Sequence, residues 1–319
     1  MPTGDPRAHH FIPRCWLAGF TETGEKDGQL WVTDLSRAKQ WQTNPGGAGH
    51  QRDLYRLSEN LDPIMAETAL SKVESAVAPI LKRIDVERLH PLEEELEPLL
   101  YFVALQWARV PSFRPWILGI TDKFTRKEFC EALKSKETWE SALKKAGMSI
   151  EDPGADYASM LKLEQSGSYS LSAGTDWYML RAFEAADKVF PLLLKRHWTV
   201  AISPSGSFIG SDNPVSMDGP PGTMVGFRNA EIITFPISRH VLLTGTNVLT
   251  RPPFVNRRMI GNANTWALLR ADAQVYSHRP DFCWHDEENI EQTDWTRFSK
   301  DKFSSLRHER ITIAPKPKS

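Results

Sequence analysis

The chain has 319 residues, of which 40% are hydrophobic, and 39 Lys and Arg balance 40 Asp and Glu to a formal net charge of -1. A chain of this size can bury a large core and forms one complex domain or two small ones. The near-neutral charge disfavours a non-specific hold on nucleic acid, which requires a basic face.

The cysteines and the apolar runs indicate a cytoplasmic protein. Cys15, Cys130 and Cys283 cannot all pair within one chain and form no disulfide framework, so we expect a reducing compartment. The first residues contain no apolar signal core. The longest apolar run, 99–105, is far too short to span a bilayer, so no membrane partner is expected.

The N-terminal region predicts strands joined by a loop. Residues 29–35 alternate apolar and polar as a half-buried strand does, and 39–42 can pair with them. The glycine-rich stretch 44–49 breaks both periodicities. Such a loop cradles phosphate only when a helix follows it directly. Because 53–57 has the pattern of a strand, 44–49 is interpreted mainly as a plain connection.

The middle of the chain is predicted to be mainly helical. Asp62 and Pro63 are a typical helix start, and that helix runs to about Arg83 with a kink at Pro79. A second apolar stripe follows, and Pro111 and Pro115 end it. Further predictions are a charged helical stretch over 121–147, a surface loop within 152–173 and a helix starting at 175 or 176.

From residue 197 onward the pattern changes to strands. Residues 198–202 and 207–209 are predicted to be strands joined by a turn at Pro204-Ser205-Gly206. Strands at 232–235 and 241–244, a helix over 255–269 and a last strand at 273–276 follow. The tail from 300 is rich in Lys and Arg, and we expect its end to be loose.

This order predicts an α+β fold, with a mostly antiparallel sheet built from the N- and C-terminal segments and a helical middle layer or subdomain. We expect one unit over 8–277, strand-rich over about 8–58 and 198–277 and helical over about 60–197. Residues 278–319 would be a partly loose C-terminal extension. If the N-terminal strands join the C-terminal sheet, His9 and His10 come close to Asp212.

Several short motifs resemble one known family, the uncharacterised bacterial DUF4238 family, over residues 8–277. The resemblance implies one continuous unit and points to the residues of these motifs as the place to look for a site. It implies no particular activity. The motifs are His9-His10-Phe11-Ile12-Pro13 with Leu17 and Phe20, Arg52-Asp53-Leu54-Tyr55, Glu67 and Glu74, Gln106 with Arg109-Val110-Pro111, Ser211-Asp212-Asn213-Pro214, Phe235-Pro236-Ile237-Ser238, and the stretch 262–276.

The leading hypothesis is a metal-dependent hydrolase acting on an anionic or phosphate-bearing substrate. Imidazole and carboxylate groups suit a divalent metal ion that holds a water or a phosphate. Arg109 would clamp the anion, and Gln106 and Asn262 would position the substrate by hydrogen bonds. The predicted metal ligands are His10, Glu67, Glu74 and Asp212, and the predicted catalytic residues are His9, His10, Arg109, Asp212 and Asn213.

A narrower version is a nuclease of the His-Asn-His type, because His-His-Phe-Ile-Pro resembles the first element of that metal motif. The spacing departs from the motif, since no Asn occurs between His10 and Asn44. The near-neutral charge also counts against nucleic acid as a partner.

Two further groups carry reactive residue types. One group has only one cysteine and no second half of a zinc motif, so a surface loop is the preferred interpretation. It consists of His278, Asp281, Cys283, His285 and Asp286. Cys15 lies near His10, but its apolar neighbours favour a buried structural thiol over a nucleophile.

The alternative from another class is a non-enzymatic ligand-binding or regulatory module, for example in a bacterial defence or toxin system. The same polar residues would then tie the two ends of the chain together. Ser-Asp-Asn-Pro is also a good turn sequence, because Asp and Asn bond to nearby backbone groups.

Overall fold

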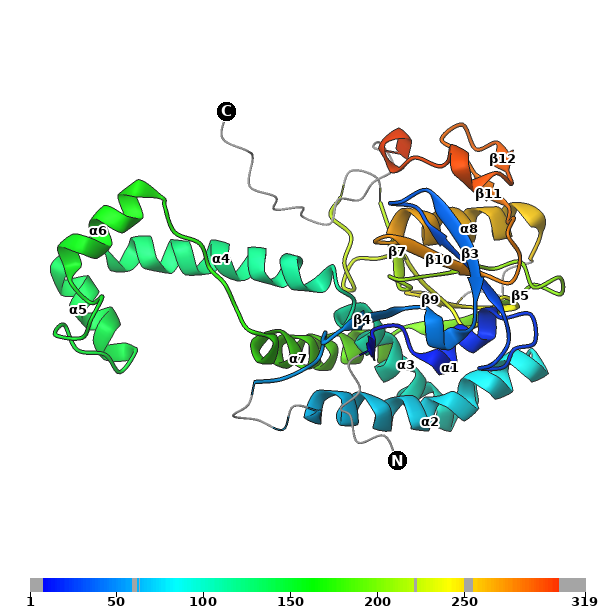
Figure 1. Cartoon of the computed structure of the whole chain (residues 1–319), viewed down its shortest axis with the longest axis horizontal. Helices are drawn as coiled ribbons and strands as arrows, with labels where there is room; N and C mark the ends of the chain where they lie inside the picture. The colour runs from blue at the N-terminus through cyan, green and yellow to red at the C-terminus, as the bar shows by residue number, and fades with distance from the viewer. Residues whose placement is uncertain (1–7, 59–61, 63, 221–222, 250–254, 304–319) are drawn as a thin grey trace. The chain divides into compact units, whose positions relative to one another are not determined.

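The computed structural model describes residues 8–58, 62, 64–220, 223–249 and 255–303. The chain divides into two compact units, the first made of Met1–Phe113 and Thr175–Arg310 and the second of Arg114–Gly174 and Ile311–Ser319. Eight α-helices and four antiparallel sheets within the described residues confirm the predicted α+β class (Figure 1). The unit boundaries fall inside the predicted helical middle rather than at its ends.

One four-stranded sheet of the first unit joins the two ends of the chain, as predicted. Its order is β3-β2-β10-β6, and every neighbouring pair is antiparallel. The bounds are Leu30–Asp34 for β2, Lys39–Thr43 for β3, Gly210–Ser211 for β6 and Gln274–Ser277 for β10. Tyr276 lies opposite Val32 on one side and Gly210 on the other, so an N-terminal strand and β6 flank the same C-terminal strand.

The two histidines lie on a strand outside that sheet. β1 (Ala8–His10) pairs with β4 (His50–Arg52) in a separate two-stranded ladder, with His10 opposite His50. The strand predicted over 53–57 is wrong, because the chain turns at Asp53, whose φ is 52°, directly after β4. Sheet pairing therefore does not carry His9 and His10 to Asp212 in the way predicted.

The second four-stranded sheet has the order β5-β9-β8-β7 and contains only C-terminal strands. These are β5 (His197–Ile202), β7 (Ser216–Asp218), β8 (Ile232–Pro236) and β9 (Val241–Thr246). The predicted hairpin between 198–202 and 207–209 is wrong. β5 pairs with β9, whereas the chain after the Pro204-Ser205-Gly206 turn continues into β6 of the other sheet.

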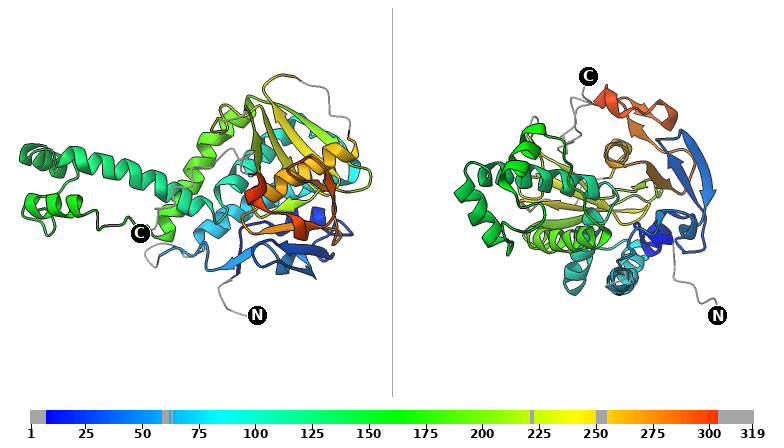
Figure 2. Two further views of the ribbon diagram at one scale, coloured as in Figure 1. Left: turned by 90° about the horizontal axis from the view of Figure 1, so that it is seen from above. Right: turned by 60° about the vertical axis from the view of Figure 1, so that its left-hand side comes forward.

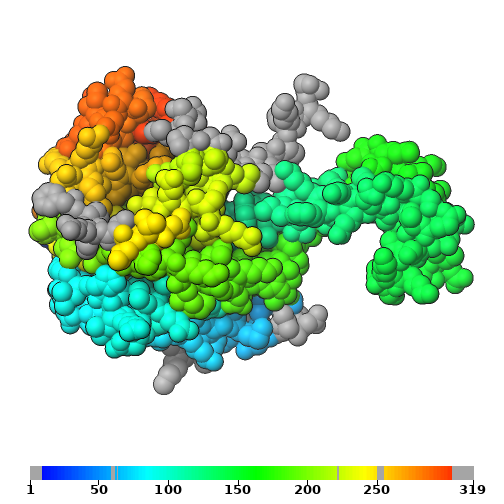
Figure 3. Space-filling model, turned by 180° about the vertical axis from the view of Figure 1, so that it is seen from behind, coloured from blue at the N-terminus to red at the C-terminus, as the bar shows by residue number. Residues whose placement is uncertain are grey.

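Helix α3 (Glu93–Ala108) packs between α2 (Met65–Glu87) and α7 (Thr175–Leu194) in the first unit. The cyan surface of α2 and α3 adjoins the green surface of α7 in Figure 3. Helix α2 buries the predicted stripe of Leu70, Val77 and Ile84, because these residues recur on one helical face. Pro79 lies inside the helix as predicted. Pro63, the other half of the predicted helix start, lies outside the described residues.

Aromatic side chains join both large sheets to the helices. Trp16, on the short α1 (Arg14–Leu17), is fully buried, and its indole N–H donates to the Pro236 carbonyl of β8 at 2.7 Å. Its ring contacts Phe235 of β8 and Tyr276 of β10. Gly210 is required beside it, because a Cβ there would lie 2.5 Å from the Trp16 ring.

Helix α8 (Arg257–Arg270) and the segment after β10 form the remaining part of the first unit (Figure 2). Asn256 caps α8 by accepting from the Met259 N–H. Residues 278–303 of the predicted extension fold against α8 and include β11 (Trp284–His285) and β12 (Glu291–Gln292), while 304–319 lie outside the described residues. The apolar contact joins Leu268 to Trp284 and Phe303.

The second unit is helical and has its own small core. Its helices are α4 (Phe113–Ala132), α5 (Lys136–Lys145) and α6 (Tyr157–Ser166). The stretch 152–173 contains the predicted surface loop at 167–173, but also helix α6, whose start is capped by the Asp156 carboxylate. The Trp139 indole donates to the Ala155 carbonyl at 2.7 Å, which closes α5 onto the segment before α6. In the described part of the chain, no helix is long and apolar enough to cross a membrane.

Candidate functional site

Arg109 follows α3 directly and is 4% exposed. Its Nε donates to the Phe11 carbonyl at 2.8 Å, one terminal nitrogen donates to the His10 carbonyl at 3.2 Å, and the other donates to Glu74 Oε1 at 2.8 Å. All three nitrogens are therefore directed at protein acceptors. This geometry ties β1 to α2 and α3, and it gives no support to the predicted role of Arg109 as a clamp for an anion.

His9 is also committed to contacts within the protein. Its Nδ1 accepts the Tyr55 backbone N–H at 2.7 Å, and the two rings stack with centroids 5.8 Å apart. Its Nε2 lies 3.5 Å from Glu67 Oε2. His9 thus joins the chain after β4 to helix α2.

Three other polar groups of this region keep unused hydrogen-bonding capacity. Gln106 is fully buried, and neither its amide nitrogen nor its oxygen has a hydrogen-bond partner in the described part of the chain. The same holds for His10 Nδ1 and Glu67 Oε2. Burial, followed by the nearby His50 and Arg14, lowers the pKa of His10 to about 4, so its ring is neutral at pH 7.

Asp212, predicted to act together with these histidines, belongs to a different network. Its carboxylate accepts the backbone N–H groups of Asp272, Ala273 and Gln274 at 2.6 to 2.8 Å, and Asn213 donates to the Asp272 side chain at 3.2 Å. Burial and the Asp272 carboxylate raise the pKa of Asp212 to about 7, against three N–H donors that favour the ionised form. Asp212 therefore holds the turn between α8 and β10.

Asn262 contacts neither group. Its side chain is exposed on α8, and its Oδ1 lies 2.8 Å from His285 Nδ1. Asp286 accepts the Ile290 and Glu288 N–H groups and the Gln292 amide, so it orders its own loop. Residues 278–283 form a loop, as expected, but Trp284–His285 form β11 and His285 is buried, so the interpretation of the whole group as a surface loop is only partly right.

The predicted metal ligands His10, Glu67, Glu74 and Asp212 do not form one site. Among the described residues, no group of three or more His, Cys, Asp or Glu side chains could hold a metal ion. Glu74 is paired with Arg109, and Asp212 is directed at three backbone amides. The metal-binding prediction thus gains no support from the ligand geometry in this part of the chain.

Two minor sequence interpretations can also be compared with the structure. The glycine-rich stretch forms a three-residue 3₁₀ turn, Pro45–Gly47, and then β4, so no α-helix follows it and it is a connection. Burial and the Glu74 carboxylate raise the pKa of the Cys15 thiol to about 11. Cys15 is therefore a protonated thiol at neutral pH, as expected for a structural cysteine.

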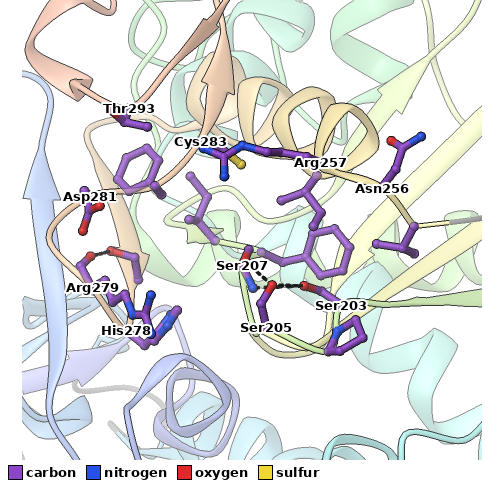
Figure 4. Close-up of a pocket in the computed structure, with 17 residues that line it drawn as sticks. Ser203, Ser205, Ser207, Asn256, Arg257, His278, Arg279, Asp281, Cys283 and Thr293 are labelled. Carbon is purple, nitrogen blue, oxygen red and sulfur yellow. Dashed lines mark hydrogen bonds between the residues drawn. The ribbon is translucent and has the colours of Figure 1, made fainter.

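A pocket with polar side chains in its walls lies elsewhere in the first unit. Its walls are the loop 203–209 after β5, the start of α8 at 255–260, and residues 277–283 after β10 (Figure 4). The cavity volume is about 360 Å³. We call this cavity the serine–arginine pocket, because Ser203, Ser205, Ser207, Arg257 and Arg279 line it.

The loop that carries the three serines is held in place by His240, which is not one of the residues that line the pocket. His240 Nε2 accepts from the Arg239 guanidinium at 3.0 Å, so His240 Nδ1 donates to the Ser203 carbonyl, also at 3.0 Å. Gly206 has φ 67° and packs on the His240 ring, where a Cβ would lie only 2.8 Å from Cε1. The glycine therefore permits both the turn and its close contact with His240.

Asn264 joins two walls of the pocket. It is 1% exposed, accepts the Ile209 N–H at 3.1 Å, and donates to the carbonyls of Ser207 and Cys283, each at 2.9 Å. One amide group thus sets the spacing between the serine loop and the segment after β10. A site whose walls are locked in this way is preorganised for a ligand.

A family model described as "Protein of unknown function (DUF4238)" matches residues 8–281, which is most of the chain. The chain belongs to the DUF4238 family. Comparison with curated proteins and with solved structures finds no match. The DUF4238 match spans Asp212, most of the serine–arginine pocket and the polar residues around β1, and it ends just before Phe282 and Cys283. We call those polar residues the β1 cluster, which consists of His9, His10, Tyr55, Glu67, Glu74, Gln106 and Arg109.

Sequence reasoning missed the residues that build this pocket of the DUF4238 chain. Pro204-Ser205-Gly206 was interpreted as a hairpin turn, although the serines at 203, 205 and 207 alternate as a polar face does. Asn264 lies in the predicted helix 255–269, more than two turns after its predicted start, and a buried amide there has no periodic signature. Arg279 lies three residues after the last predicted strand, in a loop, which is a position where binding groups often occur.

Proposed function

We propose that this DUF4238 protein binds a small ligand in the serine–arginine pocket and is a ligand-binding module rather than a hydrolase built on the β1 cluster. The observation that carries the proposal is a cavity of about 360 Å³ whose walls come from three segments far apart in sequence. This volume is within the range of roughly 300–1,000 Å³ that is typical of small-molecule sites.

The preformed state of the walls supports binding over a purely structural role. Asn264 and His240 hold the serine loop through buried or half-buried hydrogen bonds to its backbone. Their side chains face the loop backbone, so the serine hydroxyls are not needed for those contacts. Polar side chains that are held in place without being required to hold the fold are available to a ligand.

Metal-dependent hydrolysis, and its nuclease version, stay predictions. A hydrolase of that kind would need the predicted ligands to share one ion, and Glu74 and Asp212 are engaged with Arg109 and with backbone amides respectively. The feature that favours a hydrolase is the unused hydrogen-bonding capacity of His10, Glu67 and Gln106. A cytoplasmic location, a bacterial origin and a role in a defence or toxin system also stay predictions.

The test is a thermal-shift screen of a metabolite library against the wild type and Ser205→Trp. Ser205 is exposed on the pocket wall, so an indole there fills the cavity without entering the core. Ser141→Trp, on an exposed position of α5 in the second unit, is the matched control. We expect hits with the wild type and Ser141→Trp that are lost in Ser205→Trp. Hits that survive in Ser205→Trp would place binding elsewhere and overturn the proposal.

A further inference from the structure

We propose that the ligand of the serine–arginine pocket carries a phosphate group, held between the Arg279 guanidinium and the hydrogen-bonded hydroxyls of Ser205 and Ser207. This inference rests on the proposed function and names the chemical class of ligand for the same pocket. It is carried by hydrogen-bond donors that line the cavity and have no partner within the protein.

The three serine hydroxyls form a hydrogen-bonded chain (Figure 4). Ser203 Oγ lies 3.3 Å from Ser205 Oγ, which lies 2.7 Å from Ser207 Oγ. Ser203 is fully buried, and its oxygen already accepts the Ser207 backbone N–H at 3.2 Å. Its own hydrogen must therefore be donated to Ser205, because a buried hydroxyl without a partner is costly.

This chain leaves one donor for a ligand. Three hydroxyls have three hydrogens, and the two contacts between them use two. Ser203 donates to Ser205, and either hydroxyl can be the donor between Ser205 and Ser207, so the remaining hydrogen lies on Ser205 or Ser207. Both line the pocket, where Ser205 is exposed and Ser207 is partly exposed. Each donation in such a chain polarises the next, so the terminal O–H is a strengthened donor suited to an anion.

Arg279 supplies the positive charge. It is exposed on the pocket wall, and its guanidinium makes no hydrogen bond or ion pair with the protein among the described residues. Arg257, on the opposite segment, is instead paired with Glu291 at 2.6 Å. Arg279 is therefore the arginine of this pocket that is free to form a charge-assisted pair with phosphate oxygens.

The electrostatic surroundings agree with an anionic ligand. Burial lowers the pKa of His278, which lines the pocket, to about 4, and Arg239 and Arg279 are the next causes. Asp281, the one carboxylate on this wall, opposes them with a smaller effect. His278 is neutral at pH 7, so the positive potential it experiences comes from the arginines and does not depend on its own charge.

The test compares three probes that share one ring: phenyl phosphate, benzoate and phenol. Calorimetric titration of the full chain measures each Kd, and phosphorus NMR follows phenyl phosphate directly. We expect phenyl phosphate to bind tightest. Arg279→Gln should weaken it by about 10-fold or more, and Arg279→Lys by less, because charge-assisted hydrogen bonds to arginine are strong and directional. Ser207→Ala should weaken it about 5-fold.

Arg228→Gln is the matched control, because Arg228 is another exposed arginine and does not line the pocket. It should leave the Kd of phenyl phosphate unchanged. Equal affinity for benzoate would overturn the choice of phosphate, and equal affinity for phenol would overturn an anionic ligand altogether. In either case, library hits blocked by Ser205→Trp would still support the proposed function. Loss of phenyl phosphate binding in Arg228→Gln would show non-specific attraction and overturn the site.

Discussion

The β1 cluster and the serine–arginine pocket contain similar residue types but use them in opposite ways. In the β1 cluster, each nitrogen of Arg109 donates to the protein, and His9 is held between Tyr55 and Glu67. In the pocket, Arg279 has no such partner among the described residues, and the serine chain ends in a free donor. The difference teaches that unused hydrogen-bonding capacity at a cavity, rather than residue type, distinguishes a binding site from a structural tie.

The largest expected effect is on the free energy of unfolding, and it comes from removing the Arg109 side chain that ties β1 to α2 and α3. Arg109→Ala leaves the Glu74 carboxylate and the carbonyls of His10 and Phe11 without their donor. We expect the free energy of unfolding to fall by about 3–5 kcal/mol, as when one partner of a buried ion pair is removed. Chemical denaturation measures the change.

Arg37→Ala is the control for this variant, because Arg37 is exposed and lies 3.9 Å from Asp34. It should cost less than about 1 kcal/mol. An Arg109→Ala protein as stable as Arg37→Ala, but unable to bind the library hits, would reverse the comparison and make Arg109 a binding residue.

Asp212→Ala should have the next largest effect. It leaves three backbone N–H groups of the turn after α8 without an acceptor, and we expect a loss of about 2–4 kcal/mol by the same measurement. Asp27→Ala, at an exposed position, should change stability by less than about 0.5 kcal/mol. Asp212→Asn keeps one oxygen and should fall between the two. A stable Asp212→Ala protein would show that the turn does not depend on this carboxylate.

A smaller effect is expected from the titration of His10. Its pKa is lowered to about 4 in the folded chain, so the unfolded chain binds a proton first as the pH falls below about 6.5. Stability is therefore complete above pH 6.5 and decreases between pH 6.5 and 4. In His10→Gln, the pH dependence of the unfolding free energy over this range should weaken by up to about one proton.

His50→Gln is the matched variant for this titration, since His50 is exposed and faces His10 from β4. It removes a neighbouring imidazole but leaves His10 to titrate, so most of the acid dependence should remain. Identical profiles for the wild type and His10→Gln would mean that His10 does not lose a proton on folding.

The sequence predicted the architecture well where periodicity carries the information. Pairing of β2 with β3, the buried stripe of α2 and the position of α8 follow from alternation and helical spacing. It failed at Asp53, where a single left-handed residue ends β4, and at 204–206, where a good turn leads to another sheet. Turn residues specify a local reversal, but pairing partners depend on distant strands.

The site was harder to predict for a related reason. His9, Arg109 and Asp212 have the residue types of a reactive centre. The sequence does not indicate which backbone amides and carbonyls will form hydrogen bonds with them. Asn264 lies within a predicted helix and Arg279 in the loop after a predicted strand, and their roles depend on what surrounds them in space. Polar motifs therefore indicate where the chain is constrained, while free donors are visible only in three dimensions.

The smallest expected effect is on metal content. This measurement tests whether the β1 cluster is a structural tie or part of a metal site. If the β1 cluster is a tie, wild type, His10→Ala and Asp212→Ala should all contain the same background of transition metal by elemental mass spectrometry. Mg²⁺ and Mn²⁺ can be lost during purification, so both are added back by titration, and each variant should respond as the wild type does. Near one equivalent of metal in the wild type, lost in both variants while circular dichroism shows them folded, would revive the hydrolase. Such a result requires His10 and Asp212 to meet at one ion, against the separate strands and hydrogen-bond networks that hold them.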